Sequence, residues 1–79
     1  THGPFDLIVA NILAQPLIEL SDSFSAAVRP GGRALLSGLL EEQAGDIVSV
    51  YERWGFELVR HFDLETGGAT WRTLLLRRR

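Results

Sequence analysis

Residues 5–13 read Phe-Asp-Leu-Ile-Val-Ala-Asn-Ile-Leu, and this stretch decides the fold. A short apolar run with an acid near its start is typical of a buried parallel strand. Asn11 closes the run, so a side chain with both hydrogen-bond donors and an acceptor stands at the carboxyl end of the strand. Open α/β sheets build their sites at that end of their strands. The stretch therefore predicts an α/β fold with Asn11 as the first candidate functional residue.

The composition is that of one small globular domain: 79 residues, of which 46% are hydrophobic and 23% charged. The absence of Cys excludes disulfide scaffolds and thiolate metal sites. His2 and His61 are far apart and lack ligand spacing, so no metal site is expected. The net charge of −2 gives no general attraction to nucleic acid. Neither a membrane-spanning stretch nor a signal peptide is found, and a cytoplasmic location is expected.

Hydrophobic periodicity and turn residues divide the chain into elements. Helical spacing starts near Pro16 and ends at Pro30-Gly31-Gly32, where a tight turn is expected. Glu41 and Glu42 stand at the start of a second helix, where its dipole stabilises acids. The expected strands are residues 5–12, 33–40, 56–64 and 70–77, and the last two are joined by a turn at residues 66–69.

The order of these elements is β-α-β-α-β-β, with the first two strands parallel and the last two forming an antiparallel hairpin. The carboxyl ends of the first two strands then bring Asn11, Ser37 and Gly38 to one rim of the sheet. Trp54 and Trp71 are expected in the core. Alternation in the third strand predicts that one face carries Phe56, Leu58, Phe62 and Leu64.

In this order the chain resembles the C-terminal half of a Rossmann-like, S-adenosylmethionine-dependent methyltransferase. The resemblance covers almost all 79 residues and is closest to the bacterial methyltransferases of the large-subunit stalk-base ribosomal protein. Related enzymes that methylate glutamine or nucleobase amines usually carry Asn-Pro-Pro-Tyr where this chain has Asn11-Ile12-Leu13. The matching segments are Phe5–Leu13, Pro16–Leu20, Pro30–Arg33, Leu36–Ala44, Gly55-Phe56 and Trp71.

The resemblance implies methyl transfer from S-adenosylmethionine to a lysine or N-terminal amine of a large-subunit ribosomal protein. It implies that Asn11 is catalytic, that Asn11 and Ile12 contact the cofactor, and that Leu13, Ser37 and Gly38 contact the substrate. The Asn11 amide oxygen, or the carbonyl of Ile12 or Leu13, would accept a hydrogen bond from the amine and aim its lone pair. From the residues alone, Asn11 equally suits local backbone hydrogen bonding, and Ser37-Gly38 equally suits a turn.

The chain departs from that family in the parts it lacks. It has no glycine-rich loop after a first strand and no acid placed to hold a cofactor ribose, because Gly31-Gly32 precedes a strand and Gly67-Gly68 lies in a hairpin. We therefore expect residues 1–79 to be one partial domain, cut from a longer protein and inactive by itself. Without a neighbour, the strand at residues 5–12 should associate with a second copy. A same-fold methyltransferase acting on glutamine, a nucleobase or a small molecule, and a non-catalytic fragment, remain alternatives.

Overall fold

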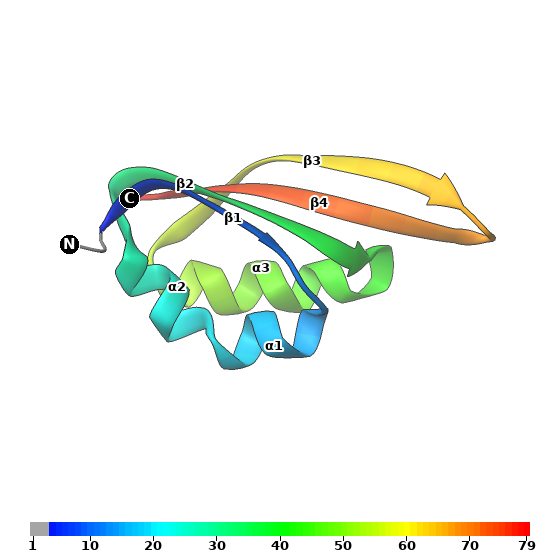
Figure 1. Cartoon of the computed structure of the whole chain (residues 1–79), viewed down its shortest axis with the longest axis horizontal. Coiled ribbons are helices and arrows are strands. Elements are labelled where there is room, and N and C mark those ends of the chain that lie inside the picture. Colours follow the sequence, from blue (N-terminus) through cyan, green and yellow to red (C-terminus); the bar gives the residue numbers. More distant parts are fainter. Residues whose placement is uncertain (1–3) are drawn as a thin grey trace.

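The computed structural model describes residues 4–79. It confirms the predicted α/β class: one mixed sheet carries all of its helices on one face, and the other face is bare (Figure 1). The elements along the chain are β1 (Phe5–Asn11), α1 (Ala14–Glu19), α2 (Ser21–Ala27), β2 (Val28–Leu40), η1 (Glu41–Gln43), α3 (Ala44–Arg53), β3 (Phe56–Thr66) and β4 (Ala69–Arg78).

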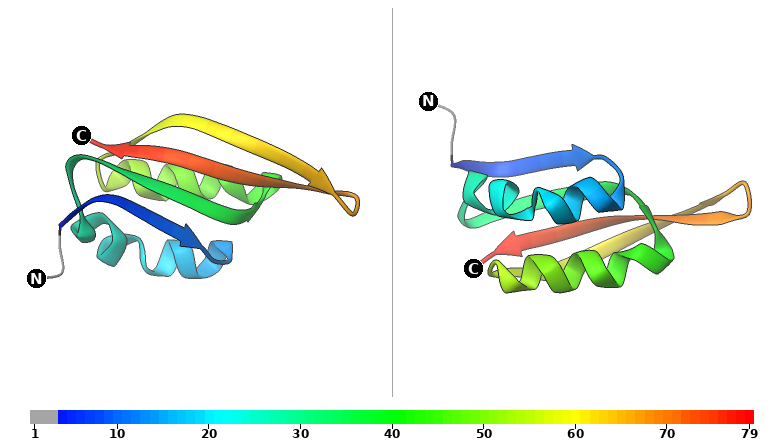
Figure 2. Two further views of the ribbon diagram at one scale, coloured as in Figure 1. Left: turned by 45° about the horizontal axis from the view of Figure 1, so that its top comes forward. Right: turned by 90° about the horizontal axis from the view of Figure 1, so that it is seen from below.

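The strand order in the sheet is β1-β2-β4-β3. β1 and β2 are parallel, whereas β4 is antiparallel to both of its neighbours. The last strand of the chain therefore lies between β2 and β3, as Figure 2 shows. The predicted parallel pair and the predicted hairpin are both confirmed. The turn of that hairpin projects past the ends of β1 and β2 and past the helical layer (Figures 1 and 2).

The segment between β1 and β2 differs from the single helix predicted. Two short helices form instead, joined at Leu20, and Pro16 is the third residue of α1 rather than its first. Proline fits there because the first four N–H groups of a helix have no intrahelical partner. The tight turn predicted at Pro30-Gly31-Gly32 is an irregular part of β2: Phe5 pairs with Val28 but Leu7 pairs with Arg33, which leaves residues 29–32 outside the regular ladder.

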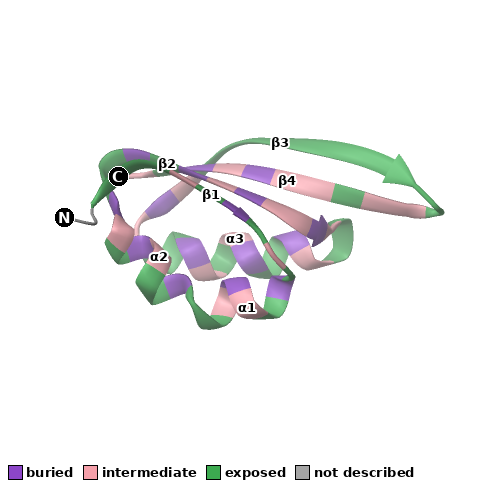
Figure 3. Cartoon of the chain, in the orientation of Figure 1, coloured by how far each residue is buried: buried purple, intermediate pink, exposed green. Residues whose placement is uncertain are grey.

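The core lies between the sheet and the helices. Tyr51 of α3 is fully buried, and its hydroxyl donates a hydrogen bond to the Leu17 carbonyl oxygen of α1 at 2.8 Å. Burial of such side chains contributes roughly 1.5–3 kcal/mol each. The buried residues line the inner side of the helices and the strands facing them (Figure 3). Those that are at most 1% exposed are Leu17, Val28, Ala34, Leu36, Leu39, Ile47, Tyr51, Phe56, Leu74 and Leu76.

The prediction of one apolar face on the third strand is wrong beyond Leu58. The pairing of β3 with β4 slips between Leu58 and Arg60, so Leu58 lies opposite Leu76 while Phe62 lies opposite Thr73. An extra residue of this kind reverses the alternation, which places Phe62 and Leu64 on the bare face. They are 50% and 66% exposed.

The expectation that both tryptophans belong to the core is also wrong. Trp54 is 47% exposed and Trp71 37% exposed. The indole of Trp54 follows the last turn of α3 and donates a hydrogen bond to Ser21 Oγ at 3.1 Å. Its polar edge therefore fastens α3 to α2 while much of the ring remains in solvent.

Candidate active site

The candidate site lies where the two parallel strands end. Asn11 is the last residue of β1, and it lies opposite Ser37 of β2 in the parallel register. Ala10, directly before it, is buried against the helices, whereas Asn11 is exposed at the rim. The strand thus anchors its polar end through an apolar neighbour that points the opposite way. The predicted meeting of Asn11 with Ser37-Gly38 is confirmed.

Ser37 fastens the two strand ends to each other. Its hydroxyl donates a long hydrogen bond of 3.5 Å to the carbonyl oxygen of Ala10, the residue before Asn11. The pairing of β2 with β4 shifts between Leu36 and Leu39, so Ser37 and Gly38 lie at an irregularity in the sheet. Irregularities of this kind re-aim side chains at sheet rims and next to active sites.

Gly38 is the point on which two oxygen atoms converge. Its φ of +84° is a left-handed conformation that favours glycine. A side chain there would begin 2.8 Å from Asn11 Oδ1 and 3.1 Å from the carbonyl oxygen of Ile12. The rim therefore presents a side-chain amide oxygen and a backbone oxygen toward the same space, and both are hydrogen-bond acceptors.

The carbonyl of Leu13 has a different role. It accepts a hydrogen bond from the Leu17 N–H at 3.3 Å, as part of the first turn of α1. Its side chain is 68% exposed and lies just outside the helix, at the N-cap position. Of the two backbone oxygens that the sequence left as alternatives, the one of Ile12 faces Gly38 and the one of Leu13 closes a helix.

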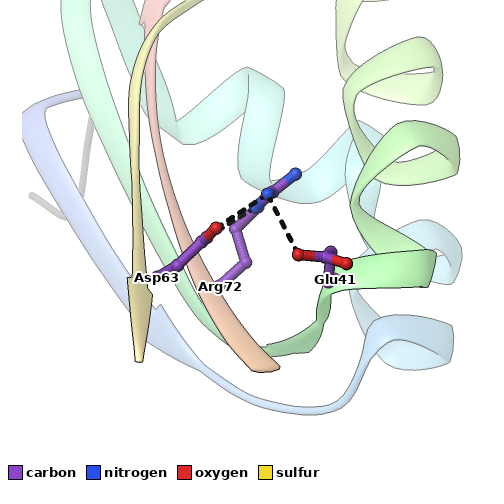
Figure 4. A network of polar contacts seen from close by, with 3 residues as sticks. All are labelled: Glu41, Asp63 and Arg72. Carbon is purple, nitrogen blue, oxygen red and sulfur yellow. Dashed lines mark hydrogen bonds and ion pairs between the residues drawn. The ribbon is translucent and has the colours of Figure 1, made fainter. Parts of the chain in front are cut away.

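A charged network that sequence reasoning missed connects the projecting hairpin to the end of β2 (Figure 4). Arg72 of β4 makes two bonds to Asp63 of β3, from Nε to Oδ1 at 2.7 Å and from Nη2 to Oδ2 at 2.9 Å. The same guanidinium lies 3.6 Å from a carboxylate oxygen of Glu41, the residue directly after β2. Counting outward from the Gly67-Gly68 turn would have paired Asp63 with Arg72.

This network shifts the acid–base equilibria of its members. The hydrogen bond from Arg72 holds the pKa of the Asp63 carboxyl below its ordinary value. The same bond raises the pKa of the Arg72 guanidinium. Glu41 therefore serves the hairpin as well as the helical turn that it begins. A carboxylate already paired with an arginine is a poor candidate for general-base chemistry.

The remaining acids, histidines and hollows lie away from the rim or outside the described residues. Asp6 lies at the opposite end of β1 and is paired with Arg29 at 2.9 Å. Within residues 4–79, no three His, Asp or Glu side chains come together as a metal site, and His2 lies outside the described part. A groove of about 660 Å³ on the bare face and a hollow of about 380 Å³ at the hairpin turn do not include Asn11.

The rim residues fit an amine donor better than they fit a nucleotide-like cofactor. The oxygens of Asn11 and Ile12 suit an N–H group, whereas a cofactor cradle needs a glycine-rich turn that opens a helix. Among the described residues, Gly38 is the glycine at this rim, and it is followed by the last residues of a strand. No helix in residues 4–79 has the length and apolarity that crossing a bilayer requires.

Comparisons with known proteins agree on one family. The family model described as "Ribosomal protein L11 methyltransferase (PrmA)" matches residues 1–79. The ribosomal protein L11 methyltransferase of Bradyrhizobium diazoefficiens is 43% identical over 76 residues, which are 96% of this chain and 24% of that protein. The chain spans about a quarter or less of the length of the curated relatives it matches.

Solved structures give the same result. The ribosomal protein L11 methylase of Lactobacillus delbrueckii subsp. bulgaricus superposes with a TM-score of 0.77 at 29% identity, covering 98% of this chain and 38% of that one. The N-methyltransferase NodS of Bradyrhizobium japonicum, in complex with S-adenosyl-L-homocysteine, has a TM-score of 0.71 at 15% identity, covering 99% of this chain and 48% of that one. The second likeness shows the fold alone, which is Rossmann-like.

Proposed function

Because the chain belongs to the ribosomal protein L11 methyltransferase family, we propose that it forms the acceptor side of an enzyme that methylates that ribosomal protein. The methyl donor of this proposal is S-adenosylmethionine, and the acceptor is a lysine or N-terminal amine. Residues 1–79 are then one partial domain, whose cofactor-binding half lies outside this chain. A cytoplasmic location follows from the ribosomal substrate.

The convergence of Asn11 Oδ1 and the Ile12 carbonyl oxygen on one space carries the proposal. A neutral amine must present its lone pair to the methyl carbon, so its N–H groups have to point elsewhere. Two fixed acceptors at the end of a strand give those N–H groups a direction. Holding reactants in line in this manner is the main contribution that a protein makes to such a transfer.

The chemistry divides between the cofactor and the chain. When bound, S-adenosylmethionine supplies an electrophilic methyl group on a sulfonium. Asn11 and Ile12 accept the amine N–H groups, hold the nitrogen in line and stabilise the positive charge that develops on it. Leu13 lines the entrance with an exposed apolar side chain, and Ser37 holds β2 against β1. The excess proton then leaves the methylated nitrogen for solvent.

The test is methyl transfer by the full-length enzyme that carries this segment, with labelled S-adenosylmethionine and purified ribosomal protein L11. Asn11→Ala should lower kcat by about 100-fold, because the amine loses one of its two acceptors. Asp6→Asn is the matched control, since it changes the same strand at its opposite end and should leave kcat unchanged. Acceptors with a blocked N-terminus or with arginine in place of lysine identify the amine. Unchanged transfer by Asn11→Ala would contradict the role of Asn11.

We further propose that the isolated 79-residue chain is inactive and binds S-adenosylmethionine weakly. Amide shifts of the labelled chain, followed by NMR as the cofactor is added, should be absent or confined to Asn11 and Ser37. Saturable micromolar binding would place a cofactor site within these residues. The alternatives of glutamine, nucleobase and small-molecule substrates are tested by offering each in place of the ribosomal protein.

Self-association is a second property that one observation favours. β1 lies at an edge of the sheet, and Phe5, Leu7 and Val9 on it are 46%, 54% and 63% exposed. An apolar edge strand offers unpaired backbone groups to another strand. We propose that the isolated chain dimerises or aggregates through residues 5–12. Light scattering should show concentration-dependent growth that Val9→Lys suppresses, and a monomer at high concentration would count against this proposal.

A further inference from the structure

We infer that Gly38 is a positioning residue for methyl transfer, acting through Asn11 and Ile12. The inference rests on the proposed function, because it concerns the two oxygens named there as amine acceptors. Gly38 itself contributes no side chain to the reaction. Its contribution is the space that its missing Cβ leaves open, which the Asn11 amide oxygen occupies.

The distances show how tight that space is. A Cβ on Gly38 would lie 2.8 Å from Asn11 Oδ1, below the 3.0 Å that real Cβ contacts essentially never fall under. It would also lie 3.1 Å from the Ile12 oxygen and 3.6 Å from its carbonyl carbon. The Ile12 oxygen is backbone and yields little. The Asn11 carboxamide is a side chain that rotates, so a methyl group at residue 38 turns it away from its present direction.

The register of the sheet gives Gly38 this control. Asn11 pairs with Ser37, so the next residue of β2 comes alongside the point where β1 ends. Ser37 donates its long hydrogen bond to Ala10 and thereby holds the two strand ends together. With both ends fixed, a group added at residue 38 cannot relax by separating the strands. The Asn11 side chain is then the part that moves.

Gly31 provides a matched control within the same strand. It has the same φ of +84°, but a Cβ on it would meet nothing within 4 Å. Gly31→Ala therefore pays only for the left-handed backbone, whereas Gly38→Ala pays for the backbone and for the displaced amide. The difference between the two variants isolates the contact with Asn11.

The experiment measures kcat and KM of the full-length enzyme that carries this segment. We expect Gly38→Ala to lower kcat by about tenfold or more relative to Gly31→Ala, with KM for ribosomal protein L11 unchanged. In an Asn11→Ala background, Gly38→Ala should lower kcat no further, because the group it displaces is gone. Equal kcat values for the two glycine variants, or an undiminished effect of Gly38→Ala in that background, would overturn the inference.

Thermal melting keeps the test decisive if Gly38→Ala is poorly folded. Removing the Asn11 amide relieves the 2.8 Å contact, so Asn11→Ala/Gly38→Ala should melt close to Gly31→Ala and above Gly38→Ala. A double variant that melts as low as Gly38→Ala would overturn the inference. Loss of kcat on Asn11→Ala without a difference between the glycine variants refutes the inference alone. Full activity of Asn11→Ala refutes the proposed function as well.

Discussion

The covered face and the bare face of the sheet are both apolar, but only the covered face has a partner. Leu36 and Leu74, beneath the helices, are at most 1% exposed, whereas Val9 and Leu64 on the opposite side are 63% and 66% exposed. The same side-chain chemistry therefore stabilises the chain on one side and remains available for contact on the other. The candidate site lies where β1 and β2 end, at the border of the two faces, so a firmly packed layer fixes its position.

Truncation of one leucine on each face gives the largest contrast. Leu36→Ala in the 79-residue chain should lower the free energy of unfolding by about 2–5 kcal/mol, because it empties a packed site. Leu64→Ala removes the same atoms from solvent and should stay within about 0.5 kcal/mol. Urea denaturation of both variants measures the contrast, and equal losses would show that the bare face is also packed. In the full-length enzyme a larger cost for Leu64→Ala would show that this face acquires a cover.

Two neighbouring arginines of β4 allow a polar version of the same contrast. Arg78 reaches the helical side, where its Nη1 donates to the carbonyl oxygens of Ser25, at 2.9 Å, and of Val28. Arg77 points to the other side and lies 3.5 Å from Glu57. Arg78→Met should cost about 1.5–3 kcal/mol, because charged hydrogen bonds to partly buried carbonyls are lost. Arg77→Met should cost well under about 1 kcal/mol, and a reversed ranking in urea denaturation would contradict this account.

Local sequence patterns predicted most of the sheet and the rim, and the misses share one cause. The apolar run to Asn11 and the turn residues at Gly67-Gly68 depend on near neighbours, so periodicity finds them. The bulge at Val59, which sends Phe62 to the bare face, depends on how β3 pairs with β4. The convergence of oxygens on Gly38 likewise depends on the register between two strands. Pairing across strands carries no signal at one position of a single sequence.

The buried hydroxyl of Tyr51 predicts a pH dependence on the covered face. Burial raises its pKa to about 12, above the ordinary value of 10.0 expected in the unfolded chain. Stability from this group is therefore complete below pH 10 and declines as the pH rises toward 12, since the unfolded state releases the proton first. Tyr51→Phe should remove that decline and cost about 1 kcal/mol at neutral pH through the lost bond to Leu17. A decline between pH 10 and 12 that persists in Tyr51→Phe would assign it to other groups.

The ion pair of Asp63 and Arg72 should give the smallest effect, because it lies where the hairpin projects beyond the helices and water reaches it (Figure 4). The pKa of Asp63 is lowered by the hydrogen bond from Arg72, so the stabilisation is present above the ordinary value of 3.8 and declines as the pH falls through the folded value. Hydrogen exchange of the β3–β4 amides at low salt should show weaker protection in Asp63→Asn at neutral pH, and the difference from the parent chain should shrink on acidification. Glu65→Gln, on the same strand and nearer the turn, is the control and should behave as the parent. If Asp63→Asn retained full protection at neutral pH, the helices alone would account for the order of the hairpin, and the covered face would extend its influence beyond the residues it buries.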